Sequence, residues 1–276
     1  MNNFYSDKIN EFNKRLTANN LELLPYDEEE HEICKKIGNL KVRPFLGELL
    51  TNFYFHDSFM DAIGGFNSKT RRYFNNIVNK ISVTAHPYVQ SGNAYSKAYN
   101  GKVGSIFLTA EPLREMDFIA FSHEMGHLPY LIDNSKEDYY EYIEAFPMFL
   151  EYLACKYLNE DDLKAKERYL QIIMERVNFS ANFIVNKDKE ITGEDEAKDT
   201  YLYCEEREYY KYITSAEFAM QLIERMDKNR FVVNREIDKY VNHDKSMKDI
   251  AKKLDIDVKG CKTLVKVADN FNSSRK

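Results

Sequence analysis

The sequence of 276 residues has no tryptophan and little glycine or proline, with ten and six residues respectively. Both fall near half of their usual share, about 7% and about 5%, which disfavours a turn-rich β fold and favours long helices. No apolar run reaches the length of about 18 residues that a transmembrane helix needs, so we expect no membrane partner. The first residues lack a basic segment followed by an apolar one, which predicts no secretory signal and a cytoplasmic location.

A surplus of positive charge is also missing. The chain has 39 Lys and Arg against 45 Asp and Glu, a net charge of −6. This argues against a broad nucleic-acid-binding surface. The four cysteines, at positions 34, 155, 204 and 261, are far apart and form no CxxC pair. They fit neither a disulfide framework nor a thiolate metal site, so we expect free thiols.

Apolar periodicity predicts a mostly α protein with one small β element around residues 83–109. The best strand is 103–109, which follows a loop-rich stretch containing several glycines. No boundary divides the chain, so we expect a single domain over 1–276, with a helical part at 1–82, a core at 83–227 and a helical part at 228–276. Helices are expected over 2–20, 28–41, 44–63, 69–82, 112–131, 138–158, 160–185 and 196–227, with shorter ones to 270.

Residues 123–127 read His-Glu-Met-Gly-His within the helix expected at 112–131. Met116 and Ala120 precede the two histidines on one helical stripe, so the imidazoles continue a buried face. Side chains four residues apart lie about 5–6 Å from one another and can bind one ion at about 2.0–2.1 Å. Glu124 lies about 100° round the helix from His123, beside the water that such an ion activates. The pattern predicts one Zn²⁺ per chain, with His123 and His127 as ligands.

A catalytic zinc needs a third protein ligand. Glu144 lies in the apolar sequence Ile-Glu-Ala-Phe-Pro, where an unpaired carboxylate would be costly and a metal ion would offset that cost. Glu141, in a more polar turn rich in tyrosine, is the second choice. Glu151 lies two turns along the same face as Glu144 and could accept the free ring N–H of a ligating histidine.

Three blocks of sequence then point to a family. Residues 121–127 read Phe-Ser-His-Glu-Met-Gly-His, residues 144–151 read Glu-Ala-Phe-Pro-Met-Phe-Leu-Glu, and residues 208–215 read Glu-Tyr-Tyr-Lys-Tyr-Ile-Thr-Ser. In this order they resemble the thimet oligopeptidase and oligoendopeptidase F family of zinc metallopeptidases. A weaker block, Gly-Asn-Ala-Tyr at 92–95 with the strand at 103–109, is similar to that family's substrate-binding segment. The chain is about half the usual size for the family.

The resemblance implies a zincin-like helical catalytic domain that hydrolyses peptide bonds with a metal-activated water. It implies that Glu144 binds zinc, that Glu151 supports a ligand histidine and that Glu124 is the general base. A hydroxyl from Tyr212 or Tyr209, rather than Tyr210, would face the scissile carbonyl, although a tyrosine stripe also fits plain core packing. The strand at 103–109 would take the peptide backbone along its edge. The substrate-binding positions so implied are Gly104, Ser105, Ile106 and Tyr95.

Two other classes of function also fit parts of the sequence. In the first, the zinc ion holds helices together in a non-catalytic binding module. Glu124 argues against it, because a purely structural site has no use for that carboxylate. In the second, residues 246–269 act as a helix-turn-helix in a DNA-binding regulator, or else form a terminal hairpin on the core. The acidic chain favours the hairpin. An enzyme acting on peptides therefore remains the preferred prediction.

Overall fold

The computed structural model describes residues 2–45, 47–78, 81, 83–86, 94–95, 106–109, 112–132 and 138–273. At residues 2–3, 83–86, 94–95, 106–109, 132 and 271–273 only the backbone is described. Gly104 and Ser105, two of the expected substrate-binding residues, lie outside these ranges.

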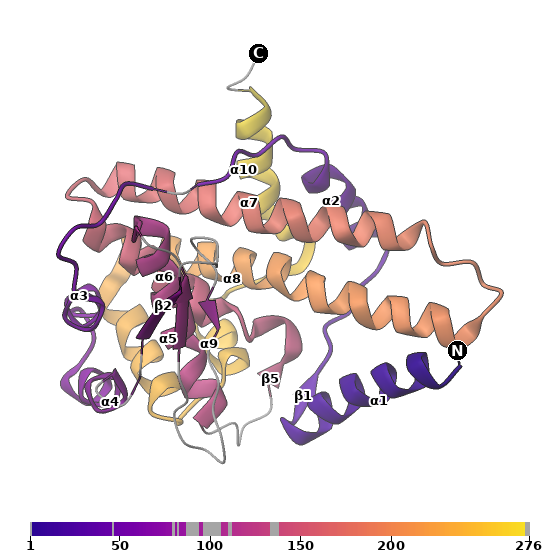
Figure 1. Cartoon of the computed structure of the whole chain (residues 1–276), viewed down its shortest axis with the longest axis horizontal. Helices are drawn as coiled ribbons and strands as arrows, with labels where there is room; N and C mark the ends of the chain where they lie inside the picture. The colour runs from indigo at the N-terminus through magenta and orange to yellow at the C-terminus, as the bar shows by residue number, and fades with distance from the viewer. Residues whose placement is uncertain are drawn as a thin grey trace.

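The described chain is mostly helical, as the sequence predicts, with small β elements (Figure 1). The helices are α1 (Asn2–Ala18), α2 (Glu28–Gly38), α3 (Phe55–Ala62), α4 (Ser68–Val78), α5 (Glu115–Ile132), η1 (Tyr140–Tyr142), α6 (Ala145–Leu158), α7 (Asp162–Asp188), α8 (Glu196–Val241), α9 (Met247–Leu254), η2 (Lys259–Cys261) and α10 (Lys262–Ser273). The strands are β1 (Leu21–Glu22), β2 (Val83–His86), β3 (Ala94–Tyr95), β4 (Ile106–Thr109) and β5 (Asp138–Tyr139).

The helix α6 is the centre of the fold. Its residues 145–155 are all buried, and it packs against α5, α7 and α8. The long helices α7 and α8 run side by side across the molecule (Figure 1), and α8 changes direction at Asn229, where the backbone leaves helical geometry (φ −154°, ψ 82°). The residues at the start of α6 are therefore held close to both α5 and α8.

The small sheet forms where the sequence places a β element, but the strand expected at its edge lies in the middle. The strand order is β2-β4-β3, so β4 is central: it pairs in parallel with β2 and antiparallel with β3. The backbone of β4 at 107–108 is thus engaged on both sides, and this strand does not offer the free edge that the sequence led us to expect. The outer strand β3, which carries Tyr95, also contacts α5. Residues 103–105 of the predicted strand lie outside the described ranges.

The predicted helix over 44–63 is wrong in its first half. Helix α3 begins only at Phe55, because Gly47 (φ +72°) and Asn52 (φ +54°) adopt left-handed backbone conformations. The segment instead follows the chain just before α5: the Leu50 N–H donates to the Leu113 carbonyl at 2.8 Å. Contacts with a distant segment thus replace the local helical hydrogen bonds.

The predicted helix over 138–158 is also interrupted at its start. Asp138 and Tyr139 pair in parallel with β1, a pairing that the sequence did not suggest. The Asp138 carboxylate accepts hydrogen bonds from the first N–H groups of the segment at Met247 and Lys248, at 2.8 and 3.1 Å, and so caps α9. The continuous helix α6 begins only after Glu144. As a result Glu144 lies at a change of chain direction rather than within a helix.

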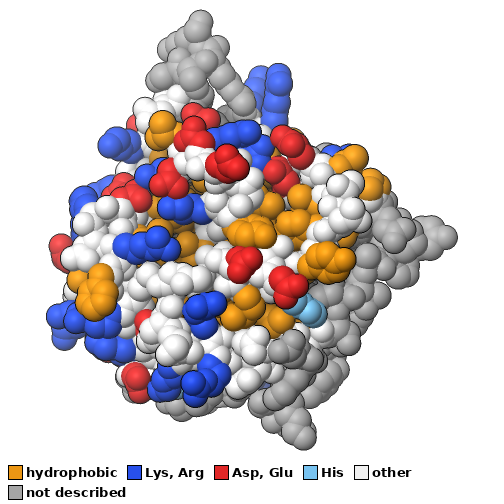
Figure 2. Space-filling model, turned by 90° about the vertical axis from the view of Figure 1, so that its left-hand side faces the viewer, with side chains coloured by type: hydrophobic (Ala, Val, Ile, Leu, Met, Phe, Trp, Pro, Cys, Tyr) orange, Lys and Arg blue, Asp and Glu red, His pale blue; other side chains and the backbone are white. Residues whose placement is uncertain are grey.

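The C-terminal segment packs on the core, as the hairpin interpretation expects. Helix α9 contacts α8 and buries Met247, Ile250, Ala251 and Leu254, while α10 contacts α8 and α2. The four cysteines are free and buried. None of the described helices combines the length and apolar character needed to cross a bilayer. On the face that carries α3 and α4, hydrophobic side chains gather near the centre with acidic and basic side chains around them (Figure 2).

Candidate metal centre

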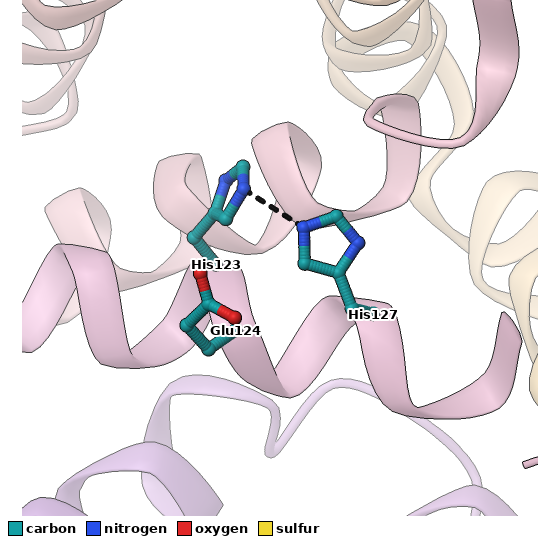
Figure 3. A group of neighbouring side chains, drawn as sticks. All are labelled: His123, Glu124 and His127. Atoms are coloured by element: carbon teal, nitrogen blue, oxygen red, sulfur yellow. Dashed lines mark hydrogen bonds between the residues drawn. The ribbon is translucent and has the colours of Figure 1, made fainter. Parts of the chain in front are cut away.

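His123 and His127 face one another on α5. Their Nε2 atoms are 3.1 Å apart, and Figure 3 shows the two rings turned together across one helical turn. Glu124 lies beside them, and the ligand atoms of these three side chains are all within 4.8 Å of one another. His123 and Glu124 are buried, and His127 is partly buried. The described chain therefore contains a His-Glu-His group able to hold a metal ion, as the HExxH pattern predicts.

The side chain of Glu144 also approaches the two imidazoles. Glu144 Oε2 lies 3.2 Å from His123 Nε2 and 3.3 Å from His127 Nε2. Glu144 precedes the first residue of α6, yet its side chain makes no capping hydrogen bond to that helix. Its Oε2 atom is buried without a hydrogen bond of good geometry. The carboxylate is therefore directed at the histidines rather than at its own helix.

The spacing of these three atoms fits a tetrahedral ion. With bonds of about 2.0–2.1 Å to nitrogen or oxygen, the ligand atoms of such an ion lie about 3.3 Å apart. The three observed separations are 3.1, 3.2 and 3.3 Å. The residues present thus suit a zinc ion in number, type and spacing.

Glu151 supports one of the two histidines. Its Oε1 atom lies 2.7 Å from His123 Nδ1 and 2.6 Å from the Arg176 guanidinium of α7. Burial by itself would lower the pKa of His123, but the negative charge of Glu151 and the closeness of the Glu144 and Glu151 carboxylates, as acceptors, raise it to about 9. Since a ligating histidine must be neutral, binding of a metal ion here releases a proton.

Lys211 on α8 is a further charged residue at the centre. Its ammonium lies 3.2 Å from Glu144 Oε1, and its side chain is only 12% exposed. Burial opposes ionisation of Glu144, but His127 and Lys211 outweigh it and hold the pKa of Glu144 well below its ordinary value. The sequence analysis did not identify Lys211 or Arg176. Arg176 left a signal, since it is a lone cation with Ile172, Ile173 and Phe179 one turn away on α7. Lys211 left none, because polar residues also lie one turn away from it on α8.

Glu141, the second choice for the third ligand, is bound elsewhere. It is fully buried in η1, forms an ion pair with the equally buried Arg207, and accepts a hydrogen bond of 2.9 Å from the Leu24 N–H. Glu141 is thus buried, although its turn is rich in polar residues. Local sequence could not reveal its ion pair, because the partner of Glu141 comes from α8.

Tyr209, Tyr210 and Tyr212 of α8 point in different directions. Tyr212 lies on the side of the metal centre: the Lys211 ammonium is 5.0 Å from the centre of its ring, and the charge of Glu144, with burial, raises the pKa of its phenol. Tyr209 instead stacks on Phe183 of α7, with ring centroids 3.7 Å apart. The buried Tyr210 packs against Tyr26 at 4.6 Å. Of the two tyrosines preferred from the sequence, Tyr212 is the one next to Lys211 and Tyr209 is packed against α7.

No family model and no curated protein matches this sequence. Among solved structures, a protein of Bacillus anthracis str. Ames assigned as oligoendopeptidase F superposes with a TM-score of 0.58 and 15% sequence identity, over 97% of this chain and 55% of that one. Pz peptidase A, solved with an inhibitor, superposes with a TM-score of 0.54 and 12% identity, over 97% of this chain and 58% of that one. This chain has the fold of these peptidases.

The likeness confirms the expected fold and the expected size. Nearly all of this chain is matched, and it spans 55% and 58% of the lengths of the two proteins. At these low identities the comparison speaks for the fold alone. The arrangement of His123, Glu124 and His127 on α5 is an independent observation from the side chains.

Gly126, between the two histidines, is where α5 and α6 approach most tightly. A Cβ atom at this position would lie 2.5 Å from Pro147 Cα and 2.8 Å from Pro147 N. Both are backbone atoms near the start of α6, so they cannot move without shifting the helix. Glu144 and Glu151 move with that helix. The glycine therefore sets the distance between the histidines of α5 and the carboxylates of α6.

We expect Gly126→Ala to lower both stability and metal affinity. The overlap should cost about 1–3 kcal/mol of unfolding free energy, the usual range for overpacking. Melting curves of the metal-free protein and zinc titrations measure the two effects. Gly193→Ala is the control for zinc affinity: its left-handed backbone (φ +70°) strains an alanine and lowers stability, but an added Cβ there meets nothing within 4 Å. Parent-like melting and zinc binding of Gly126→Ala would show that the close approach is not required.

Proposed function

We propose that this protein is a zinc-dependent peptidase that hydrolyses peptide bonds. The observation that carries the proposal is the convergence of His123, His127 and Glu144 to within 3.3 Å of one another, with Glu124 beside them. These three residues would hold the ion, and Glu124 would remain free to act on water. The likeness in fold to oligoendopeptidase F and Pz peptidase A supports a peptide as the substrate.

When bound, zinc polarises a carbonyl group and lowers the pKa of water to about 7. The residues of the chain perform the proton transfers. Glu124 accepts the proton of the attacking water and then delivers it to the amine that leaves, as general base and general acid. Glu151, held by Arg176, keeps the His123 ring in place through its Nδ1 atom.

Tyr212 and the small sheet would handle the substrate. The Tyr212 hydroxyl, beside Glu144, would donate a hydrogen bond to the oxyanion that forms from the scissile carbonyl. The sheet edge that lies near α5 belongs to β3, with Ala94 and Tyr95. An extended peptide added at this edge would bind through its backbone and so tolerate varied side chains.

The alternative is a helical module in which zinc has a purely structural role. Structural zinc sites usually take four protein ligands. Within the described residues, three side chains converge at 3.1–3.3 Å, and we assign the neighbouring Glu124 carboxylate to the water rather than to the ion. Three ligands with an adjacent base favour catalysis over a structural role.

The proposal is tested by metal analysis together with cleavage of quenched fluorescent peptides of mixed sequence. We expect one zinc per chain, cleavage that a chelator abolishes, and recovery when zinc is returned. Stoichiometric zinc without cleavage of any peptide in the library would favour the structural module. A protein that binds no zinc would exclude both.

Tyr212→Phe removes one hydroxyl and keeps the ring, so packing should survive. If the hydroxyl donates to the oxyanion, kcat should fall by about 10²–10³ with KM little changed, as for other single donors of this kind. Tyr209→Phe is the matched control, because Tyr209 stacks on Phe183 and should leave kcat at the parent value. Steady-state kinetics and melting curves of both variants measure this. A fall of less than tenfold for Tyr212→Phe would remove the residue from the mechanism.

A further inference from the structure

The two oxygens of Glu144 have different neighbours. Oε2 faces the imidazoles of His123 and His127, whereas Oε1 lies 3.2 Å from the Lys211 ammonium. The last torsion of a glutamate is broad, so the side chain alone does not fix the orientation of the carboxylate plane. A neighbouring group must fix that orientation, and Lys211 is placed to do so.

Lys211 is itself tightly held. Its ammonium lies 5.0 Å from the ring centre of Tyr212 and 5.5 Å from that of Tyr140, so aromatic faces enclose it. A buried cation needs a carboxylate partner. Glu208 is farther away, at 3.8 Å, and is shared with Arg15 and with the Tyr140 hydroxyl. Glu144 is therefore the main partner of Lys211. Aromatic rings hold Lys211 in place, and the two histidines lie against Glu144.

Two sets of side-chain contacts thus orient the residues of the metal centre. On one side Arg176 of α7 holds Glu151, which holds His123. On the other side Lys211 of α8 holds Glu144 directly. Each of these two metal-facing residues is oriented by a buried cation from one of the long helices. The first set of contacts is the usual support of a ligand histidine. The second set orients the Glu144 carboxylate.

We propose that Lys211 is a positioning residue, which binds one oxygen of the Glu144 carboxylate and so holds its plane with a single oxygen facing the metal. The inference rests on the metal centre of the proposed function but not on peptide cleavage. Loss of the ammonium would free the carboxylate to turn, and the ion would then meet a poorly oriented ligand or both oxygens at once. The change should appear in metal binding even when no substrate is present.

The test compares Lys211→Met with the parent and with Lys187→Met. Lys187 is a good control because it is also partly buried, pairs with Glu205 at 3.2 Å and lies 5.2 Å from the ring centre of Phe183. We measure Zn²⁺ affinity by competition with a chelator, and the visible absorption of the Co²⁺-substituted protein, which reports the number of ligand atoms. For Lys211→Met we expect about 10–100-fold weaker Zn²⁺ binding and an altered Co²⁺ spectrum. Lys187→Met should resemble the parent.

Two further variants keep the inference testable if Lys211→Met does not fold. Lys211→Arg preserves the charge and should recover most of the affinity and the parent spectrum. Lys211→Gln preserves a hydrogen-bond donor without the charge and should lie between the other two. A folded Met or Gln variant with parent Zn²⁺ affinity and parent Co²⁺ spectrum would overturn the inference and leave the proposed function standing. A parent protein that binds neither metal would overturn both.

Discussion

Glu124→Gln should bind zinc like the parent and lose peptidase activity, with kcat lower by about 10²–10⁴. The substitution keeps the size of the side chain and removes its basicity. The three atoms that converge at 3.1–3.3 Å belong to His123, His127 and Glu144, so the metal site should stay intact. Zinc titration and steady-state cleavage of a fluorescent peptide measure the two properties separately.

Glu115→Gln on the same helix is the control for this variant. Glu115 pairs with Arg168 at the start of α5, away from the histidines, so its loss should lower the melting temperature and leave kcat unchanged. Parent-like cleavage by Glu124→Gln would exclude the proposed mechanism. If the variant also lost zinc, Glu124 would belong among the ligands instead of acting as the base.

Glu144→Ala should weaken zinc binding by about 1,000-fold or more, since removing a ligand must cost more than the roughly 10–100-fold lost with a supporting partner. Of the glutamates next to the histidines, Glu144 has the oxygen that lies at 3.2 and 3.3 Å from both Nε2 atoms. Competition with a chelator measures the affinity, and circular dichroism establishes that the variant is folded. Binding within tenfold of the parent would move the third ligand to another residue.

Glu141→Ala should show the opposite behaviour. Arg207 would lose its ion-pair partner in a fully buried position, and leaving a buried charge unpaired costs about 3–5 kcal/mol. The melting temperature should therefore fall strongly while the folded protein keeps its zinc affinity. Low-temperature zinc titrations and melting curves on both glutamate variants separate the two roles. Weaker zinc binding by Glu141→Ala than by Glu144→Ala would reverse the assignment.

Some structural details depend on partners that local periodicity does not reveal. The helix expected over 44–63 begins only at Phe55, because the preceding segment bonds to the chain before α5. The strand at 106–109 is recognisable from its composition, yet its central place in the sheet depends on β2 and β3. Elements with strong local patterns were thus predicted well, and those shaped by distant contacts were not.

The sequence by itself determined that the protein is mostly helical and that His123, Glu124 and His127 stand together. Both follow from local rules: helical periodicity, and a four-residue spacing that brings two side chains to one face. Only the tertiary structure decided which glutamate of the following segment meets the histidines and which tyrosine lies next to Lys211. It also revealed that Arg176 pairs with Glu151 and that Lys211 pairs with Glu144. These contacts join α5, α6, α7 and α8, whose close packing, including the approach at Gly126, no local pattern specifies.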